Sequence, residues 1–466
     1  MAISSPAISS PATGLTDLQL MAHLYRRAGF GATRDELEAA VARGYEVTVE
    51  ELLHPERQPD LDMDLIYRFY PDMKEEREIE ITQAYWVYRM INSTRQLEEK
   101  MALFWHSLFA TAFNKANHAQ MVHRQVNMFR QHCLGNFRTI LVELSRDPAM
   151  IFWLDNQENT KDVHNENYGR ELLELFSMGI GPYTEDDVKE CARAFTGWGI
   201  KNLLNAGPYG RNVWEFQFYP EQHDDGEKEF LGQRGNFDGT DIINIVVEHP
   251  ATAHFIARRL YLFFVSDKPD EAAIEELAQV FRDADGDIRS VMRALLLSDA
   301  FRSSRNYLAK VKAPAEHVVG IAKLVGDFRY PSFGIVDLAY ECRYMGQDLM
   351  NPPSVEGWHV GKEWIDTGIL VERVNFASEQ VGNASKPGIR ALINRLRAMG
   401  PLEPEALVEA CLDLMGPVSV QPGVRQALLN HAQQGGVLDL DGDPAAERRV
   451  TSLLQLIVAT REYQFA

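Results

Sequence analysis

The chain has 466 residues and a formal net charge of −20, from 47 lysines and arginines against 67 aspartates and glutamates. Hydrophobic residues at 45% and charged residues at 24% are typical of a folded protein and exclude disorder of the whole chain. A surface this acidic repels phosphate backbones and anionic membranes. The apolar run at 260–265 is also far shorter than the roughly 20 residues needed to span a bilayer. We therefore expect neither nucleic-acid binding nor membrane insertion.

The N-terminus and the cysteines bear on the cellular compartment. Residues 1–15 are rich in Ser, Pro and Ala and lack both a basic region and a continuous apolar stretch, so they predict a disordered leader and not a signal peptide. The four cysteines are far apart and form no C-x-x-C pair, which favours small buried thiols over disulfides or a zinc site. We therefore expect a soluble protein of the cytoplasm.

Helix signals dominate most of the chain. Thr33-x-x-Glu36 and Thr48-x-x-Glu51 have the pattern of a capping box, in which the two side chains satisfy the first backbone amides of a helix. Asp287 is expected to cap a helix, because Ala294 stands where a calcium loop at 283–294 would need a glutamate. Apolar residues at helical spacing predict helices at about 74–93, 95–114, 119–134, 136–146, 165–178, 185–197, 240–248, 251–265, 270–282 and 287–298.

The periodicity changes in one region. Apolar and polar residues alternate over 214–219, turn residues follow at 223–226, and a second alternating run occupies 227–231, which together predict a β-hairpin over 214–231. The composition changes again near 383–388. The sequence therefore predicts a mainly α protein: a large helical domain over 16–382 that contains the hairpin, and a helical C-terminal appendage over 386–466.

The segment 164–176 is the richest in polar side chains. At 3.6 residues per turn, Glu166, Arg170 and Glu174 fall along one line of a helix, and Asn167 and Glu171 lie beside it. Apolar side chains occupy the opposite side: Leu172, Leu173, Leu175 and Phe176. The polar face is either a solvated ladder of i,i+4 ion pairs worth about 0.2–0.5 kcal/mol each, or a functional surface turned into a cleft.

Acid–base chemistry needs a carboxyl group whose pKa is raised by burial or by a like charge. Glu171 and Glu174, three residues apart, could form such a pair, with Arg170 setting which of them stays ionised. Asn165 could then position a ligand with its amide, as could Asn167. His223 and Asp224, at the expected hairpin tip, could close over this face, or could simply belong to an Asp-Gly turn.

Metal binding is a further hypothesis. Oxygen and imidazole ligands suit several divalent ions, and Asp155 and Glu171 are the principal candidate ligands, with Glu166, His106 and His223 as further ones. Against this, a histidine such as His106, within an apolar run, is more often a satisfied core residue. No H-E-x-x-H, G-x-S-x-G or phosphate-binding glycine loop occurs in the chain.

The sequence 351–358, Asn-Pro-Pro-Ser-Val-Glu-Gly-Trp, forms a different kind of signal. Its two prolines enforce extended backbone, Gly357 permits a close approach, and Trp358 supplies a large apolar surface. Such a rigid aromatic loop either lines a pocket or plugs a layer of helices, and we favour the plug.

Many short sequence motifs of the chain resemble those of the bacterial family catalogued as domain of unknown function 1800, and they occur in the same order as in that family. They lie at 26–33, 104–106, 134–137, 146–150, 165–176, 183–184, 194–198, 223–224, 230–232, 235–239 and 351–358. The resemblance extends from about residue 18 to 380 and implies a shared fold, but no reaction, because the family has no established activity. His359 departs from the family pattern, which usually has proline there. Relatives commonly look exported and are often encoded beside a sulfatase-like protein, so the resemblance also implies a partner of that kind.

Two functional hypotheses follow. The first is an enzyme, with metal assistance as one version, acting on a polar small molecule or polymer. Glu171 would be the acid–base or ligand group, Arg170 would hold an anion, and the rest of the site would comprise Glu166, Asn165, Asn167, His106, His223, Asp224 and Asp155. The second is a non-catalytic binding or assembly protein in which the same polar network only fixes helix packing. An open cleft beside these residues would favour the enzyme, and a closed, fully hydrogen-bonded cluster the scaffold.

Overall fold

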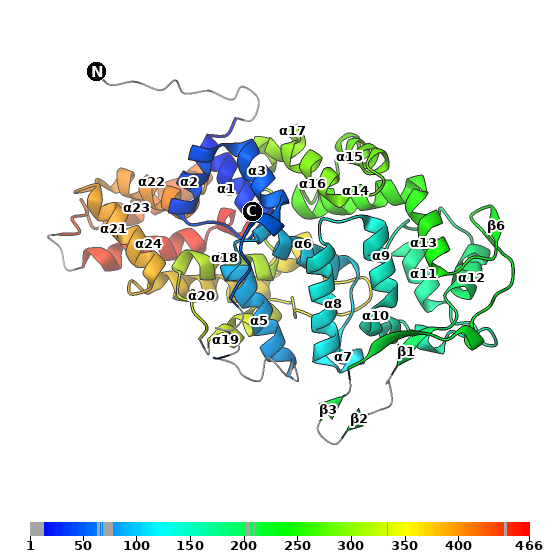
Figure 1. Ribbon diagram of the computed structural model, residues 1–466. Helices are drawn as coiled ribbons and strands as arrows, with labels where there is room; N and C mark the ends of the chain where they lie inside the picture. The colour runs from blue at the N-terminus through cyan, green and yellow to red at the C-terminus, as the bar shows by residue number, and fades with distance from the viewer. Residues whose placement is uncertain are drawn as a thin grey trace.

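The computed structural model in Figure 1 describes residues 14–62, 66, 68, 78–201, 206–207, 210–211, 213–332, 334–441 and 445–466. Except for residues 14 and 15, the predicted leader lies outside the described residues.

The protein is mainly α-helical, as predicted. The α-helices are α1 (Asp17–Arg27), α2 (Arg34–Arg43), α3 (Tyr45–Leu53), α5 (Ile79–Asn92), α6 (Gln96–Leu108), α7 (Phe113–Ala116), α8 (Ala119–His132), α9 (Phe137–Arg146), α10 (Pro148–Trp153), α11 (Asn167–Glu174), α12 (Glu185–Ala194), α13 (Gly239–Glu248), α14 (Pro250–Phe264), α15 (Glu271–Asp283), α16 (Ile288–Leu297), α17 (Asp299–Arg302), α18 (Pro314–Val325), α19 (Ile335–Tyr344), α20 (Thr367–Gly382), α21 (Pro387–Ala398), α22 (Pro404–Leu414), α23 (Pro422–Gln433) and α24 (Ala446–Val458).

Short 3₁₀ helices and strands complete the described elements. The 3₁₀ helices are η1 (Pro55–Arg57), η3 (Asn156–Glu158), η4 (Pro220–Gln222), η5 (Ser304–Asn306), η6 (Gly361–Ile365) and η7 (Glu462–Gln464). The strands are β1 (Trp198–Lys201), β2 (Ala206–Gly207), β3 (Gly210–Arg211), β4 (Glu215–Phe218), β5 (Lys228–Phe230) and β6 (Gln233–Gly235).

Local capping signals fix several helix starts. The Thr33 hydroxyl accepts a hydrogen bond from the backbone N–H of Glu36, and the Glu36 carboxylate accepts one from the backbone N–H of Thr33, so this capping box is confirmed. The predicted cap at Asp287 is confirmed as well, because its carboxylate accepts from the backbone N–H of Ser290. The start predicted at Thr48 is wrong: α3 begins three residues earlier, and the Thr48 hydroxyl donates to the carbonyl oxygen of Gly44 within the helix.

An inserted β region is present, but its pairing differs from the simple hairpin that the alternation predicts. Strand β4 pairs antiparallel with β1, so that Trp198 stands opposite Phe218, while β5 pairs with β6. The two predicted strands therefore belong to different two-stranded ribbons. The apolar side chains of Ile200 and Trp214 explain the arrangement, since both are buried in a small cluster against α8 and α10.

Figure 1 shows an elongated molecule with α21–α24 at one end, α5 and α6 in the middle, and α10–α13 with the β ribbons at the other end. The last residues return to the middle, where Val311 pairs with Phe465. Helix α24 packs on α20 and α21 packs on α18. The predicted boundary between a domain at 16–382 and an appendage at 386–466 stays a prediction.

Buried ion pairs hold the middle of the molecule together. The carboxylate of Glu99, fully buried on α6, accepts hydrogen bonds from Arg89 of α5 and Arg130 of α8. Lys100, the next residue, forms an ion pair with Glu316 of α18. These contacts fix α6, whose C-terminal turn reaches the large cleft described below.

The four cysteines are free and buried, as predicted. Within the described ranges, no helix is long and apolar enough to cross a membrane.

Candidate functional site

A large open cleft lies between the end of α14 and the loop that follows residue 351. Its volume is about 1420 Å³, larger than the roughly 300–1,000 Å³ of most small-molecule sites. The chain contributes to its wall at 259–271, 305–311 and 353–362, together with the last turn of α6 and Leu175. A cleft of this size can hold an extended ligand.

The loop 351–358 forms one wall of this cleft. Its Gly357 has a φ of 93°, and a Cβ atom there would collide with the carbonyl oxygen of Ser107, so only glycine allows the loop to pack on α6. The Asn351 side chain accepts from the backbone N–H of Asn114, which anchors the loop at its start. The structure combines the two alternatives for this loop. Trp358 is buried against the core, as expected of a plug, and the same loop also lines the cleft.

His106 lies directly behind this wall. Its ring is fully buried and contacts Trp358 edge-on, with 5.2 Å between ring centroids, and Trp86 at 5.7 Å. Neither ring nitrogen has a hydrogen-bond partner among the described residues, and burial lowers the pKa of His106 to about 3. His106 is therefore a neutral core residue that supports the cleft wall.

Glu171 has surroundings suited to proton transfer. It is half-buried on α11, and its carboxylate has no hydrogen bond or ion pair with any part of the chain that the structure describes. Burial raises its pKa, and the negative charges of Glu174 and Glu356 raise it further against the opposing effect of Arg170. Glu356 and Leu175 line the cleft, whereas Glu171 itself is not part of the lining and is linked to it through the charge of Glu356.

Arg170 and Glu166 form an ion-pair ladder on the outside of the molecule. The guanidinium of Arg170 donates to both carboxylate oxygens of Glu185, at 2.9 and 2.8 Å, and to Glu166 at 3.1 Å. Both carboxylates are more than a third exposed. This part of the helix corresponds to the solvated-face interpretation of the sequence, and such exposed pairs contribute about 0–1 kcal/mol each.

The asparagines before α11 form a closed network. The Asn165 side chain accepts from the backbone N–H of Asn167 at 3.0 Å and donates to the carbonyl oxygen of Asp155. The backbone N–H of Asn165 donates to the side chain of Asn159, which is buried. The amide groups of Asn165 and Asn159 are thus used to hold the loop, and the side chain of Asn167 is exposed.

His223 and Asp224 follow η4 and are anchored on α12 and the turn after it. The imidazole of His223 is buried and donates to the carbonyl oxygen of Thr196 at 2.8 Å. Asp224 accepts two hydrogen bonds from Arg193, which holds the pKa of its carboxyl group at about 2. The expectation that this pair stands at a hairpin tip is wrong, because β4 pairs with β1 and no turn joins it to β5.

The candidate metal ligands are not assembled into a recognisable site. Asp155 forms an ion pair with Lys115 at 2.8 Å, whereas the nearest charged partners of Glu171 are Glu174, Arg170 and Glu356. No group of three or more His, Cys, Asp or Glu side chains in the described part of the chain is arranged to hold a metal ion.

Two further carboxylates act on Glu171: Glu174, which the sequence already suggested as its pair, and Glu356, which the sequence did not connect with it. Glu174 is at i+3 from Glu171 and accepts from the hydroxyl of Tyr183 at 3.4 Å. Glu356 comes from a distant loop, which packs on α6 at Gly357, and its charge raises the pKa of Glu171. Glu356 belongs to the motif at 351–358, but nothing in the sequence alone connects this motif with the polar helix at 167–174.

These features define a mainly helical protein with an extended open cleft and carboxylates at its edge. The sequence profile of the family described as Protein of unknown function (DUF1800) matches residues 23–465, nearly the whole chain. The chain belongs to this family, as the motifs predicted. No curated protein and no solved structure matched it.

Proposed function

We propose that the protein is an enzyme that uses Glu171 for proton transfer on an extended polar substrate bound in the large cleft. The observation that carries this proposal is the state of Glu171. Among the carboxylates of the predicted site, it is the one without a hydrogen bond or ion pair to the described residues, whereas Glu166, Asp155 and Asp224 are all paired.

The chemistry of Glu171 follows from its neighbours. Burial and the charges of Glu174 and Glu356 raise its pKa, so its protonated form persists closer to neutral pH. A carboxyl group in this state can donate a proton to a leaving group and recover it afterwards. Glu356, on the cleft wall, provides a second carboxylate that can act as the base.

The cleft lining supports an extended polar substrate. Two of its ion pairs, Asp267 with Lys310 and Asp270 with Arg305, are already satisfied within the protein. Three other cations that line the cleft have no carboxylate partner within the described ranges: Arg259, Lys268 and Lys362. Aromatic rings also line it: Phe104, Tyr261, Phe263, Trp358 and Phe465. Such a combination suits a chain molecule with polar groups and apolar faces.

A substrate screen with matched variants tests the proposal. Wild-type protein, Glu171→Gln and Glu185→Gln would be incubated with panels of oligosaccharides and peptides, and products would be detected by mass spectrometry. Glutamine at 171 retains the shape without the transferable proton, and a decrease in kcat of about 10²–10⁴-fold is expected. Glu185 pairs with Arg170 on the exposed face of the same helix pair, so its variant should retain activity. Equal turnover by wild type and Glu171→Gln would refute the role of Glu171.

The metal-assisted version of this enzyme requires a separate test. Elemental analysis of protein purified without chelator or affinity metal, repeated for Glu171→Ala, would detect a bound divalent ion. Stoichiometric metal that is lost in the variant would support a metal ligand role for Glu171. Protein without metal that still turns over substrate would refute it.

The alternative is a binding or assembly protein, and one observation favours it. The closed hydrogen-bond network of Asn165, Asn159, His223 and Asp224 is what a purely structural polar cluster requires. In this case the cleft would hold a segment of a partner, for which the sulfatase-like protein encoded beside relatives is the candidate. Sedimentation of the two proteins together would reveal a complex, and Glu171→Gln would leave it intact.

We also infer a cytoplasmic location from the four free, buried cysteines, which suit a reducing compartment. Fractionation of cells that express the full chain would test this inference, since export to the periplasm would contradict it.

A further inference from the structure

A second, smaller cavity lies between α1, α18 and the C-terminal segment, apart from the proposed enzyme site. Its volume is about 70 Å³, and a cavity needs roughly 10–15 Å³ by this measure to hold one water molecule. The cavity therefore has room for a few water molecules or one small polyatomic ion. Phe30, Ile321, Leu324 and Met415 contribute apolar walls.

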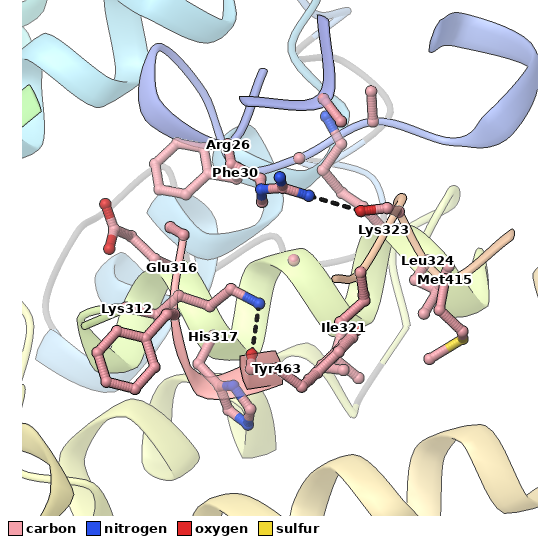
Figure 2. A pocket seen from close by; sticks show the side chains of 18 of the residues that line it. Arg26, Phe30, Lys312, Glu316, His317, Ile321, Lys323, Leu324, Met415 and Tyr463 are labelled. Carbon is pink, nitrogen blue, oxygen red and sulfur yellow. Dashed lines mark hydrogen bonds between the residues drawn. The ribbon is translucent and has the colours of Figure 1, made fainter. Parts of the chain in front are cut away.

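Positive side chains converge on this cavity. Figure 2 shows Arg26 of α1 and Lys312, just before α18, reaching into it from different elements. Arg26 donates one hydrogen bond to the carbonyl oxygen of Gly416 at 2.7 Å, while its Nε and second terminal nitrogen are buried without a partner among the described residues. Lys312 donates to the carbonyl oxygen of Tyr463 at 2.8 Å and lies over the Tyr463 ring.

Among the described residues, the cations and the carboxylates that line this cavity form no ion pair with one another. Within the described ranges, neither Arg26 nor Lys312 forms an ion pair, and the same holds for Lys323, a third cation that lines the cavity. Glu316, the nearest acidic side chain on α18, is engaged by Lys100 and by the backbone N–H of Ala313. All three cations are half-buried, so leaving their charges unpaired costs free energy, and the charge of Glu316 offsets this cost only in part for Lys312.

A further buried arginine, Arg373, adds positive charge near Lys312. Arg373 of α20 is fully buried, donates its Nε–H to Gln464 at 2.9 Å, and has two terminal nitrogens without partners in the described part of the chain. Burial lowers the pKa of Lys312 well below its usual value, and the charges of Arg26 and Arg373 lower it further. An anion in the cavity would raise the pKa of Lys312 again and would accept hydrogen bonds from the unpaired nitrogens of Arg26.

We propose that this cavity is a binding site for one small oxyanion, a phosphate or a carboxylate, held by Arg26 and Lys312. The planar guanidinium fork of Arg26 can donate two parallel hydrogen bonds to either group, and Lys312 adds a point charge from the other side. Glu462 lines the same cavity; one oxygen accepts from the backbone N–H of Gln421, and the other is buried without a partner in the described residues. This oxygen can accept from the hydroxyl group of hydrogen phosphate or of a 2-hydroxy acid.

Calorimetric titration of the full-length protein tests the site. The probes are inorganic phosphate and glycolate, added to protein in chloride buffer at constant ionic strength, so that the two arms distinguish a phosphate site from a carboxylate site. We expect one ion bound per chain for at least one probe. Loss of a charge-assisted hydrogen bond in Arg26→Gln or Lys312→Gln should weaken binding about tenfold or more.

The matched control is Arg234→Gln, which removes one positive charge from the exposed β6 ribbon at the far end of the molecule. It should bind the probe as the wild type does. Circular dichroism would check that each variant is folded, and Lys312→Gln serves if Arg26→Gln does not fold. The proposal is overturned if neither probe binds to the wild type, or if Arg234→Gln weakens binding as much as the cavity variants.

Discussion

Replacement of Glu99 by glutamine is the most direct test of how the middle of the molecule is held together. The Glu99 carboxylate accepts from Arg89 Nε at 2.6 Å, from Arg130 Nε at 2.9 Å and from an Arg130 terminal nitrogen at 3.1 Å. These three bonds join α5, α6 and α8. Glutamine keeps the shape but removes the charge, so two buried guanidinium groups would lose their common partner.

The expected loss can be worked from these contacts. Three charge-assisted hydrogen bonds at about 1.5–3 kcal/mol each give an upper range of about 5–9 kcal/mol. Arg89 keeps a second partner in Asp60 at 2.8 Å, and glutamine still offers one acceptor, so the real loss is smaller. We expect about 3–5 kcal/mol, the usual cost of removing one partner of a buried ion pair. This is a large part of the about 5–15 kcal/mol that stabilises a typical domain.

Urea unfolding followed by circular dichroism at pH 7 measures this loss. The control is Glu229→Gln, which breaks an exposed pair with Arg234 that should contribute less than about 1 kcal/mol. If Glu99→Gln shifts the unfolding free energy no more than the control does, the buried triad does not stabilise the fold and our reasoning is wrong.

Three further predictions concern pH and backbone geometry. Burial, and then a neighbouring carboxylate, raises the pKa of Glu98 from 4.5 to about 7, so its ionisation costs stability as the pH rises through this window. Glu98→Gln should therefore stabilise the protein at pH 8 by up to about 3 kcal/mol, with the gain vanishing near pH 4 in thermal melts. The pKa of Asp224 is lowered to about 2 by its arginine partner, so Asp224→Asn should cost about 1–2 kcal/mol at pH 7, and the difference should shrink as the pH falls from 3.8 towards 2. Gly357→Ala combines a positive φ with a collision at the Ser107 carbonyl and should cost about 1–3 kcal/mol or more, measured by thermal unfolding. Gly232→Ala has a similar φ but open space around its Cβ, and an equal loss there would show that the collision contributes nothing.

The amino-acid sequence by itself determined the local structure. The caps at Thr33 and Asp287 lie at the start of the helices they were predicted to begin, because a capping side chain and the amide it satisfies are within three residues of each other. The helical periodicity of apolar residues likewise predicted the mainly α fold, and a series of short motifs in the family's order predicted the family. Thr48 shows the limit, since the same pattern also fits a helix interior in which the hydroxyl bonds four residues back.

Only the tertiary structure decided which polar residues are engaged and which are not. The helix 167–174 carries its charges on one face, but the tertiary structure pairs Arg170 with Glu185 and leaves Glu171 without a partner among the described residues, near the negative charge of Glu356. The strand pairing of β1 with β4 was not predicted, because β1 lies outside the alternating segment, and the convergence of Arg26 with Lys312 joins segments far apart in the chain. Such contacts depend on how apolar faces pack over long separations, and no pattern within a few residues encodes that packing.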